Sequence, residues 1–173
     1  MNSHLQRREV GRSRLRFLRW LVTDRSHSTY TRETMSTDKK SSPQISPTLA
    51  VSDAAAATEF YKKAFGAEVL WTIEGGGVAG LSIDGAEFFL ADEAPEYGTR
   101  GPDRVGATTV RIELFVDDPR AVHARAIAAG AREASPVKEH EHTTFGPRPI
   151  RRMLQGSVVD PFGHKWLIGK FLE

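Results

Sequence analysis

Apolar side chains recur at every second position in several short segments between residues 44 and 171, and this alternation predicts β-strands. The apolar positions are Leu49, Val51, Phe88, Leu90, Ile112, Leu114, Val116, Trp166 and Ile168. The positions between them carry a mixed polar and aromatic set that includes Thr48, Phe89, Arg111, Glu113, Phe115 and Leu167. We therefore expect the apolar side of the sheet to pack beneath helices. Because strands twist in one direction, the mixed side is expected to be the concave wall of a cup.

Two segments combine a strand, an aspartate, an Ala-rich stretch and a glycine, and they predict helices over residues 54–64 and 119–129. Asp53 and Asp118 precede the two stretches and are suited to accept hydrogen bonds from the first helical turn. Gly66 and Gly130 follow them and are suited to end each helix. Both helices carry an apolar stripe, as expected for helices on the surface of a sheet.

The segments after the two helices also match each other, which indicates an internal duplication. Strands are predicted over 68–74 and 132–138, and the stretch 80–85 before Phe88 matches 156–161 before Trp166. The fold class is therefore α+β, with two βαβββ modules over 44–92 and 108–171 and a linker over 93–107. The modules are expected to form a curved, cup-shaped mixed sheet with the helices on its convex face.

Charge separates the first residues from the rest of the chain. Residues 1–34 carry eight arginines and three acids, a net charge of +5, which leaves −3 for the remainder of a chain whose net charge is +2. We expect residues 1–43 to be a basic, disordered extension, or translation to begin at Met35. A transit-type presequence and a basic nucleic-acid arm stay open as alternatives, although Phe17 and Trp20 are too few interleaved aromatic residues to indicate nucleic-acid binding.

The composition excludes several classes of site. There is no cysteine, which rules out disulfides, thiolate metal sites and a cysteine nucleophile. No apolar run reaches the roughly 20 residues that a membrane-spanning helix needs. We expect a cytoplasmic protein that does not enter the membrane.

Three motifs carry a resemblance to a known family: the stretch 45–53 (ISPTLAVSD), the stretch 59–67 (EFYKKAFGA) and the stretch 160–166 (DPFGHKW). Together they resemble the vicinal oxygen chelate superfamily, which contains glyoxalases, bleomycin-resistance proteins and ring-cleaving dioxygenases, and most of all its PhnB-like branch. The resemblance implies a cup that binds a small molecule and a homodimer, because cups of this family are often completed across subunits.

Metal-dependent members of that superfamily place His or Glu at four strand positions that line the cup. The motif alignment puts these positions at Ser46, Phe89, Arg111 and Leu167. None of the four is a usual ligand of a divalent ion. The resemblance therefore implies a domain without the usual metal site, and we expect no metal and no cofactor.

Arg111 and Glu113 are separated by two positions on a strand, so both side chains are expected on the cup face. Our hypothesis is that Arg111 anchors a carboxylate or phosphonate-like group of an anionic ligand, with Glu113 as a hydrogen-bond acceptor or weak catalytic base. The alternative is an ordinary ion pair between them at a solvated rim. Thr48, Phe89 and Phe115 are expected to line the same cup.

A long loop over 139–149 is predicted to interrupt the second module, and it carries His140, His142 and Arg148. These three residues are expected to contribute polar contacts and positive potential to the ligand site. Metal binding by the two histidines is an alternative that lacks an evident third ligand. Of the other candidates, His164 is expected in a turn, His123 on a helix surface or interface, and Trp166 in the core.

These observations favour a metal-independent small-molecule binding protein, with drug or metabolite sequestration as one role. The alternative is a lyase or isomerase of a small oxygenated substrate that uses Glu113 as base or a metal at the histidine loop. A third possibility is a cup filled by its own side chains in a protein that acts through partners.

Overall fold

The computed structural model of the protein describes residues 44–141 and 152–172. The first module, which we define as β1 to β4, contains β1 (Thr48–Val51), α1 (Ala54–Phe65), β2 (Glu68–Thr72), β3 (Val78–Ile83) and β4 (Ala86–Asp92). The second module, β5 to β8, contains β5 (Arg111–Phe115), α3 (Pro119–Ala128), β6 (Arg132–Glu141), β7 (Arg152–Val159) and β8 (Lys165–Phe171). The connecting segment contains a short 3-10 helix, η1 (Pro95–Tyr97), and α2 (Pro102–Val105).

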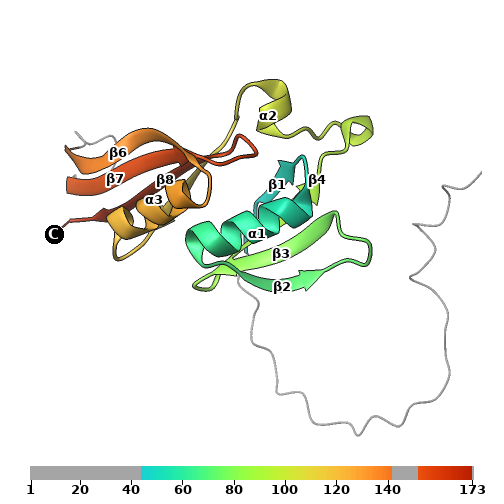
Figure 1. Ribbon diagram of the computed structural model, residues 1–173, viewed down its shortest axis with the longest axis horizontal. Helices are drawn as coiled ribbons and strands as arrows, with labels where there is room; N and C mark the ends of the chain where they lie inside the picture. Colours follow the sequence, from blue (N-terminus) through green and yellow to red (C-terminus); the bar gives the residue numbers. More distant parts are fainter. Residues whose placement is uncertain (1–43, 142–151, 173) are drawn as a thin grey trace, which may run out of the picture. The chain divides into compact units, whose positions relative to one another are not determined.

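The two modules have the same topology, so the predicted α+β fold of two βαβββ units is confirmed. The strand order is β1-β4-β3-β2 in the first sheet and β5-β8-β7-β6 in the second. The first strand of each module runs parallel to the last, and the other neighbours are antiparallel. Within the described ranges the ladders form two separate four-stranded sheets, with no strand pairing between the modules. Figure 1 shows α1 lying against β3 and β4, and α3 against the strands of the second sheet.

The helix ends follow the predicted capping chemistry. The Asp53 carboxylate accepts a hydrogen bond from the Ala56 N–H, and Asp118 accepts from the N–H groups of Arg120 and Ala121. Gly66 ends α1 in the left-handed conformation, with φ of 72°. A second carboxylate, that of Asp92 on β4, also accepts from the Ala54 N–H at 2.7 Å. The start of α1 is therefore fixed both by its own cap and by the neighbouring strand.

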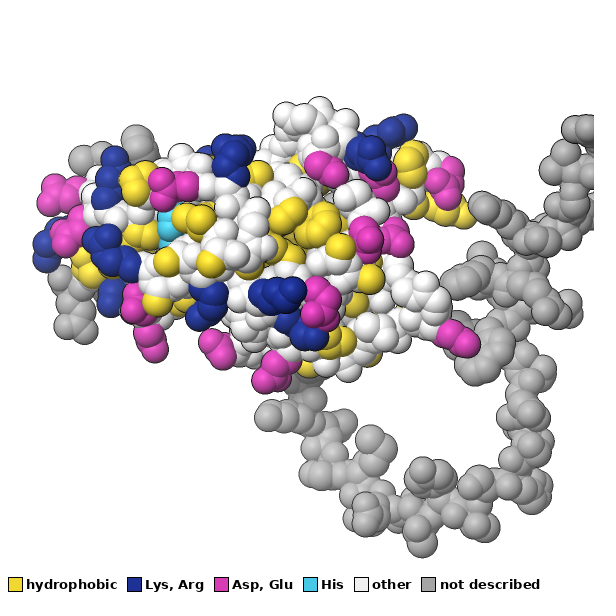
Figure 2. Space-filling view, viewed as in Figure 1, with side chains coloured by type: hydrophobic (Ala, Val, Ile, Leu, Met, Phe, Trp, Pro, Cys, Tyr) yellow, Lys and Arg dark blue, Asp and Glu magenta, His cyan; other side chains and the backbone are white. Residues whose placement is uncertain are grey.

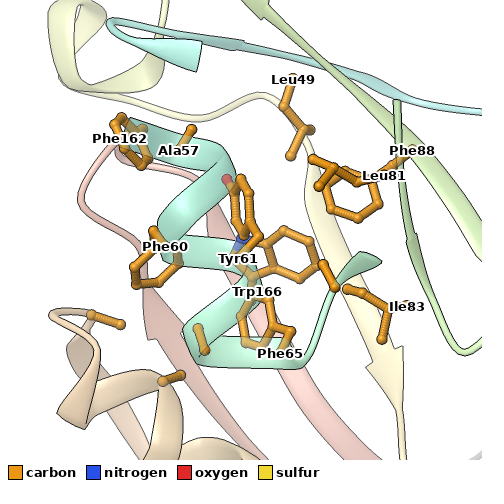
Figure 3. Packing of buried hydrophobic residues seen from close by; sticks show 14 of the residues in the cluster. Leu49, Ala57, Phe60, Tyr61, Phe65, Leu81, Ile83, Phe88, Phe162 and Trp166 are labelled. Atoms are coloured by element: carbon orange, nitrogen blue, oxygen red, sulfur yellow. The ribbon is translucent and has the colours of Figure 1, made fainter. Parts of the chain in front are cut away.

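One core joins the two modules. Its buried residues come from α1, from β1, β3 and β4 of the first module, and from α3, β7 and β8 of the second. Trp166 is 2% exposed, and its ring centroid lies 4.6 Å from that of Phe65 and 5.4 Å from that of Tyr61. Figure 3 shows Tyr61, Phe65 and Phe88 close around Trp166. The predicted packing role of Trp166 is confirmed, and burial of a side chain this size contributes on the order of 1.5–3 kcal/mol.

A buried carboxylate ties the modules together inside this core. Asp160 is 4% exposed, and its Oδ2 accepts from the Tyr61 hydroxyl at 2.6 Å and from the Trp166 indole N–H at 2.9 Å. Its Oδ1 accepts from the backbone N–H groups of Phe162 and His164, each at 2.9 Å. Four donors therefore satisfy a charge that lies out of water, which is the condition under which a buried carboxylate is tolerated.

The surface has no large single-sign patch in the view of Figure 2, where acidic and basic side chains are interspersed over the visible face. No helix in the described part of the chain is long and apolar enough to cross a membrane.

Candidate functional site

Among residues 44–141 and 152–172, helices cover one side of each sheet and leave the other side free, and we call this second side the open face. The strand register defines its rows, because side chains that are paired across neighbouring strands lie on the same side. In the first module, Thr48 pairs with Phe89, Phe89 with Gly80, and Gly80 with Trp71. Their neighbours Leu49, Phe88 and Leu81 are buried beneath the helices, so this row belongs to the open face.

The row of the first module ends in an aromatic pair built over a glycine. The ring centroids of Trp71 and Phe89 are 5.4 Å apart, and Trp71 is 43% exposed. A Cβ added at Gly80 would lie 2.4 Å from the indole nitrogen of Trp71, so the ring occupies the space that only glycine leaves. The alternation of polar and apolar residues does not by itself assign Trp71 to either side of the sheet. The sequence signal that could have placed Trp71 on the open face is Gly80, because a glycine within a strand often marks a site where another group approaches closely.

The equivalent row of the second module has different chemistry. Glu113 pairs with Leu167, Leu167 with Ser157, and Ser157 with Ser135. The hydroxyl groups of Ser135 and Ser157 are hydrogen-bonded at 2.9 Å. The first module presents an exposed indole and a half-buried phenyl ring over a glycine, whereas the second presents a carboxylate, a leucine and a hydroxyl pair.

The next row along each open face differs in charge. In the second module, Arg111 pairs with Lys165, Lys165 with Val159, and Val159 with Arg132. Three of these four side chains are cationic.

The equivalent row of the first module is acidic. It contains Ser46, Glu87, Ser82 and Glu68. Glu87 pairs with Ser82, and Ser82 with Glu68. Ser46 and Glu87 together line a pocket of about 170 Å³. Carboxylates here occupy the places that cations hold in the second module, so the charge of this row is not imposed by the fold.

Arg111 and Glu113 do not form the ion pair considered from the sequence. Both side chains are exposed, and within residues 44–141 and 152–172 neither takes part in a salt bridge. They alternate with Ile112 and Leu114, which pack against the core. Both therefore extend from the open face, and both are available to a ligand.

Phe115 lies at the end of the same strand and stacks on a partner that the sequence did not indicate. Its ring is 4.9 Å from that of Phe171, with 14° between the planes, and the two rings are 47% and 55% exposed. Phe115 also lines a pocket of about 330 Å³ at the junction of the modules. The other residues around that pocket are Phe65, Ile83, Asp84, Val116, Asp117, Asp118, Val122 and Arg125.

His140 lies on a strand, not in the loop predicted over 139–149. Strand β6 continues to Glu141, and His140 pairs with Met153 of β7. The strand is longer than predicted because β7 begins at Arg152 and provides pairing partners for residues 138–141. His142 and Arg148 lie outside the described residues.

His123 and His164, which lie within the described residues, have structural partners. His164 is buried, and its Nε2–H donates to the Ala50 carbonyl at 2.9 Å, which adds a second link between the modules. His123 is 5% exposed, and its Nε2–H donates to the Ser135 carbonyl at 3.1 Å. His123 was expected on a helix surface or at an interface; the surface position is wrong, because α3 packs that side chain against β6.

The residues do not fit a divalent ion at the place where this fold can hold one. Ser46, Phe89, Arg111 and Leu167 occupy the predicted positions. The carboxylates in the paired rows around them are Glu68 and Glu87 on the first module and Glu113 on the second. In the part of the chain that the structure describes, no three His, Asp or Glu side chains lie close enough to hold a metal ion.

The family model for the glyoxalase/bleomycin resistance protein/dioxygenase superfamily matches residues 44–168. The chain belongs to this superfamily, whose members bind small molecules. The match covers both modules and the segment that connects them.

Two mycobacterial proteins are similar over most of the chain. Uncharacterized protein Mb0911c of Mycobacterium bovis is 37% identical over 135 residues, which covers 74% of this chain and 83% of that protein. Uncharacterized protein Rv0887c of Mycobacterium tuberculosis is also 37% identical over 135 residues, with 74% of each chain covered.

Solved structures share the fold at lower identity. TioX from a Micromonospora species is 23% identical, with a TM-score of 0.54, and the match covers 75% of this chain and 100% of that one. A glyoxalase/bleomycin resistance protein/dioxygenase family enzyme from Burkholderia phytofirmans is 19% identical, with a TM-score of 0.55 and coverage of 73% and 98%. At these identities the likeness concerns the fold alone.

Proposed function

We propose that the protein is a metal-independent small-molecule binding protein of the glyoxalase and bleomycin-resistance type, whose ligand site lies on the open faces of the two modules. The observation that carries the proposal is the chemistry of these faces. Ser46, Phe89, Arg111 and Leu167 stand at the positions where a metal-dependent member needs His and Glu, and of these four only Arg111 is charged and exposed. Shape and a few polar contacts are sufficient for binding, whereas an enzyme of this kind normally needs an ion to stabilise an oxyanion.

The metal-independent part of the proposal is tested by binding measurements on the full chain with and without divalent ions. We expect isothermal titration with Zn²⁺, Ni²⁺, Mn²⁺ and Mg²⁺ to show no site whose affinity for the ion exceeds that of a weak chelator such as citrate. Ligand-induced shifts in the unfolding temperature are expected to be the same after dialysis against EDTA. A stoichiometric tight ion, together with a ligand response that depends on it, would support the lyase or isomerase alternative.

The ligand site is tested by the side chains on the open faces. A thermal-shift screen against a metabolite panel should yield ligands that stabilise the wild type. We expect Arg111→Ala to weaken the binding of the anionic ligands. Glu113→Gln should weaken the binding of ligands that donate a hydrogen bond. If neither variant, nor Phe89→Ala, changes the affinity of any ligand found, the site is elsewhere.

We further propose that the functional form is a homodimer in which two copies complete the ligand cup. The support is the exposed apolar surface on the open faces, where Trp71, Phe115 and Phe171 are each more than 40% exposed. Exposed apolar patches of this kind often mark interaction sites. Size-exclusion chromatography with light scattering gives the mass directly, and a mass near 19.2 kDa at micromolar concentration would overturn this part of the proposal.

A further inference from the structure

The open face of the second module carries a pair of like charges on neighbouring strands. Arg111 of β5 and Lys165 of β8 are direct partners in the parallel ladder. Neighbouring strands lie about 4.7–4.9 Å apart, so paired side chains on one face are close, and like charges placed there repel each other. An arrangement of this kind is unfavourable unless something of opposite charge lies between the two cations.

The chain itself does not supply that charge in the part that the structure describes. Neither Arg111 nor Lys165 takes part in a salt bridge or a side-chain hydrogen bond there. Glu113, two residues along the same face of β5, pairs across to Leu167 rather than to a cation. Arg132 adds a further cation at the end of the same row.

A second lysine on the same strand has a hydrogen-bond partner within the protein. Lys170 lies on the other side of β8, five residues from Lys165, and its ammonium group donates to the Asp117 carbonyl at 3.0 Å. The first module shows that the cations are not required by the fold, because Glu87 occupies the place equivalent to Lys165. The pairing of Arg111 with Lys165 is thus particular to the open face of the second module.

We propose that Arg111 and Lys165 together form an anchor for one anionic group of the ligand, a carboxylate, phosphate monoester or phosphonate. The guanidinium provides two parallel N–H donors to two oxygens, and the ammonium provides a point charge and a further donor to an oxygen on the strand alongside. A single oxyanion between them removes the repulsion. The inference rests on the proposed small-molecule function and adds Lys165 and the chemical class of the ligand to it.

The test uses the full chain with phenylphosphonate and benzoate as anionic probes and benzamide as a neutral probe of similar shape. Titration calorimetry or ligand-detected NMR should show phenylphosphonate binding to the wild type that weakens steeply with salt. We expect Lys165→Met and Arg111→Met each to weaken it about tenfold. Lys170→Met is the matched control and should leave the affinity unchanged. The double variant should lose little more than either single one, because both side chains hold the same group.

A second measurement does not depend on the choice of probe. Without ligand and at low salt, removal of either cation should raise the unfolding temperature slightly, and removal of both should add little, because one repulsion is relieved in each case. Inorganic phosphate should stabilise the wild type more than either variant.

The possible results separate this inference from the proposed function. Binding that is lost in Arg111→Met but unchanged in Lys165→Met would overturn the shared anchor and leave the proposed function standing. Equal affinities for benzamide and phenylphosphonate would contradict the proposal that the ligand is anionic. A wild type that responds to no member of the metabolite panel would contradict the proposed function itself.

Discussion

The two modules are alike on the side that faces the helices and different on the side that does not. On the helix side, Phe88 and Trp166 hold equivalent positions and both are buried in the shared core. On the open side, Thr48 and Phe89 are replaced by Glu113 and Leu167 in the equivalent row. A duplicated unit keeps the side chains that hold it together, whereas the exposed faces are free to acquire separate chemistry.

The difference in charge extends this comparison. Glu68 and Glu87 on the first module stand where Arg132 and Lys165 stand on the second. An anionic ligand group is therefore favoured on the second module, and the exposed indole of Trp71 on the first is suited to an apolar or planar part of the ligand. The site proposed here therefore fits a ligand with an anionic end and an apolar body.

The largest difference in stability is expected between alanine variants of Trp166 and Trp71, which lie on opposite sides of the sheets. Trp166→Ala should reduce the free energy of unfolding by about 3–5 kcal/mol, because it opens a cavity in the core that both modules share. Trp71→Ala is the matched control, and its effect should be below about 1 kcal/mol because the indole is 43% exposed. Urea unfolding measures both, and similar losses would contradict the division into a packed and an open side.

Two aspartates at the ends of equivalent strands form the next comparison. Asp160→Asn should cost about 1–3 kcal/mol, because the new amide turns a donor towards the Trp166 N–H or breaks the bonds from the backbone. Asp84 lies in the exposed hairpin turn with φ of 49°, a conformation that Asn adopts readily, so Asp84→Asn should be nearly neutral. The two variants are compared by their denaturation midpoints. A neutral Asp160→Asn would show that the buried carboxylate is not needed to join the modules.

Two glycines that match in the sequence, Gly80 and Gly156, are expected to differ in their effect on stability when replaced by alanine. A Cβ at Gly156 would lie 2.9 Å from the Val137 backbone nitrogen, so Gly156→Ala should cost about 1–3 kcal/mol. At Gly80 the obstacle is the exposed indole of Trp71, which is free to swing away. Gly80→Ala should therefore leave stability almost unchanged but shift the tryptophan fluorescence. Loss of that shift when Trp71 is also replaced by Phe would identify the ring that moves.

The smallest effect concerns alkaline pH. Burial, together with the charge and hydrogen bond of Asp160, raises the pKa of Tyr61 well above its ordinary value of about 10. Above that pH the unfolded chain releases a proton that the folded chain retains, so stability falls by about 1.4 kcal/mol per pH unit until the raised pKa is reached. Tyr61→Phe removes this contribution. Stability measured between pH 9 and 11.5 should fall less steeply in the variant, and parallel curves would contradict the assignment.

Much of the fold could be predicted from the chain because its signals are local. Period-two alternation marked the strands, and Asp53 and Gly66 marked the ends of α1. The sequence match between the two modules was, however, shifted by one residue at the third strand of each module. Gly80 was matched with Gly156, but Gly80 faces Phe89 on the open side while Gly156 faces Ile168 beneath the helices. The turn between β7 and β8 is longer than the Asp84-Gly85 turn, and this moved the apparent match.

The candidate site was less predictable, because it depends on which strands are neighbours. The βαβββ duplication, the caps of α1 and the apolar stripe beneath the helices can be recognised from the chain alone, because each depends on residues close together in sequence. Three contacts become visible only in the folded protein: Trp71 lies over Gly80, Lys165 stands beside Arg111, and Asp160 accepts a hydrogen bond from Tyr61. Those contacts join residues far apart in the sequence, and the strand register and helix packing that create them are properties of the folded chain as a whole.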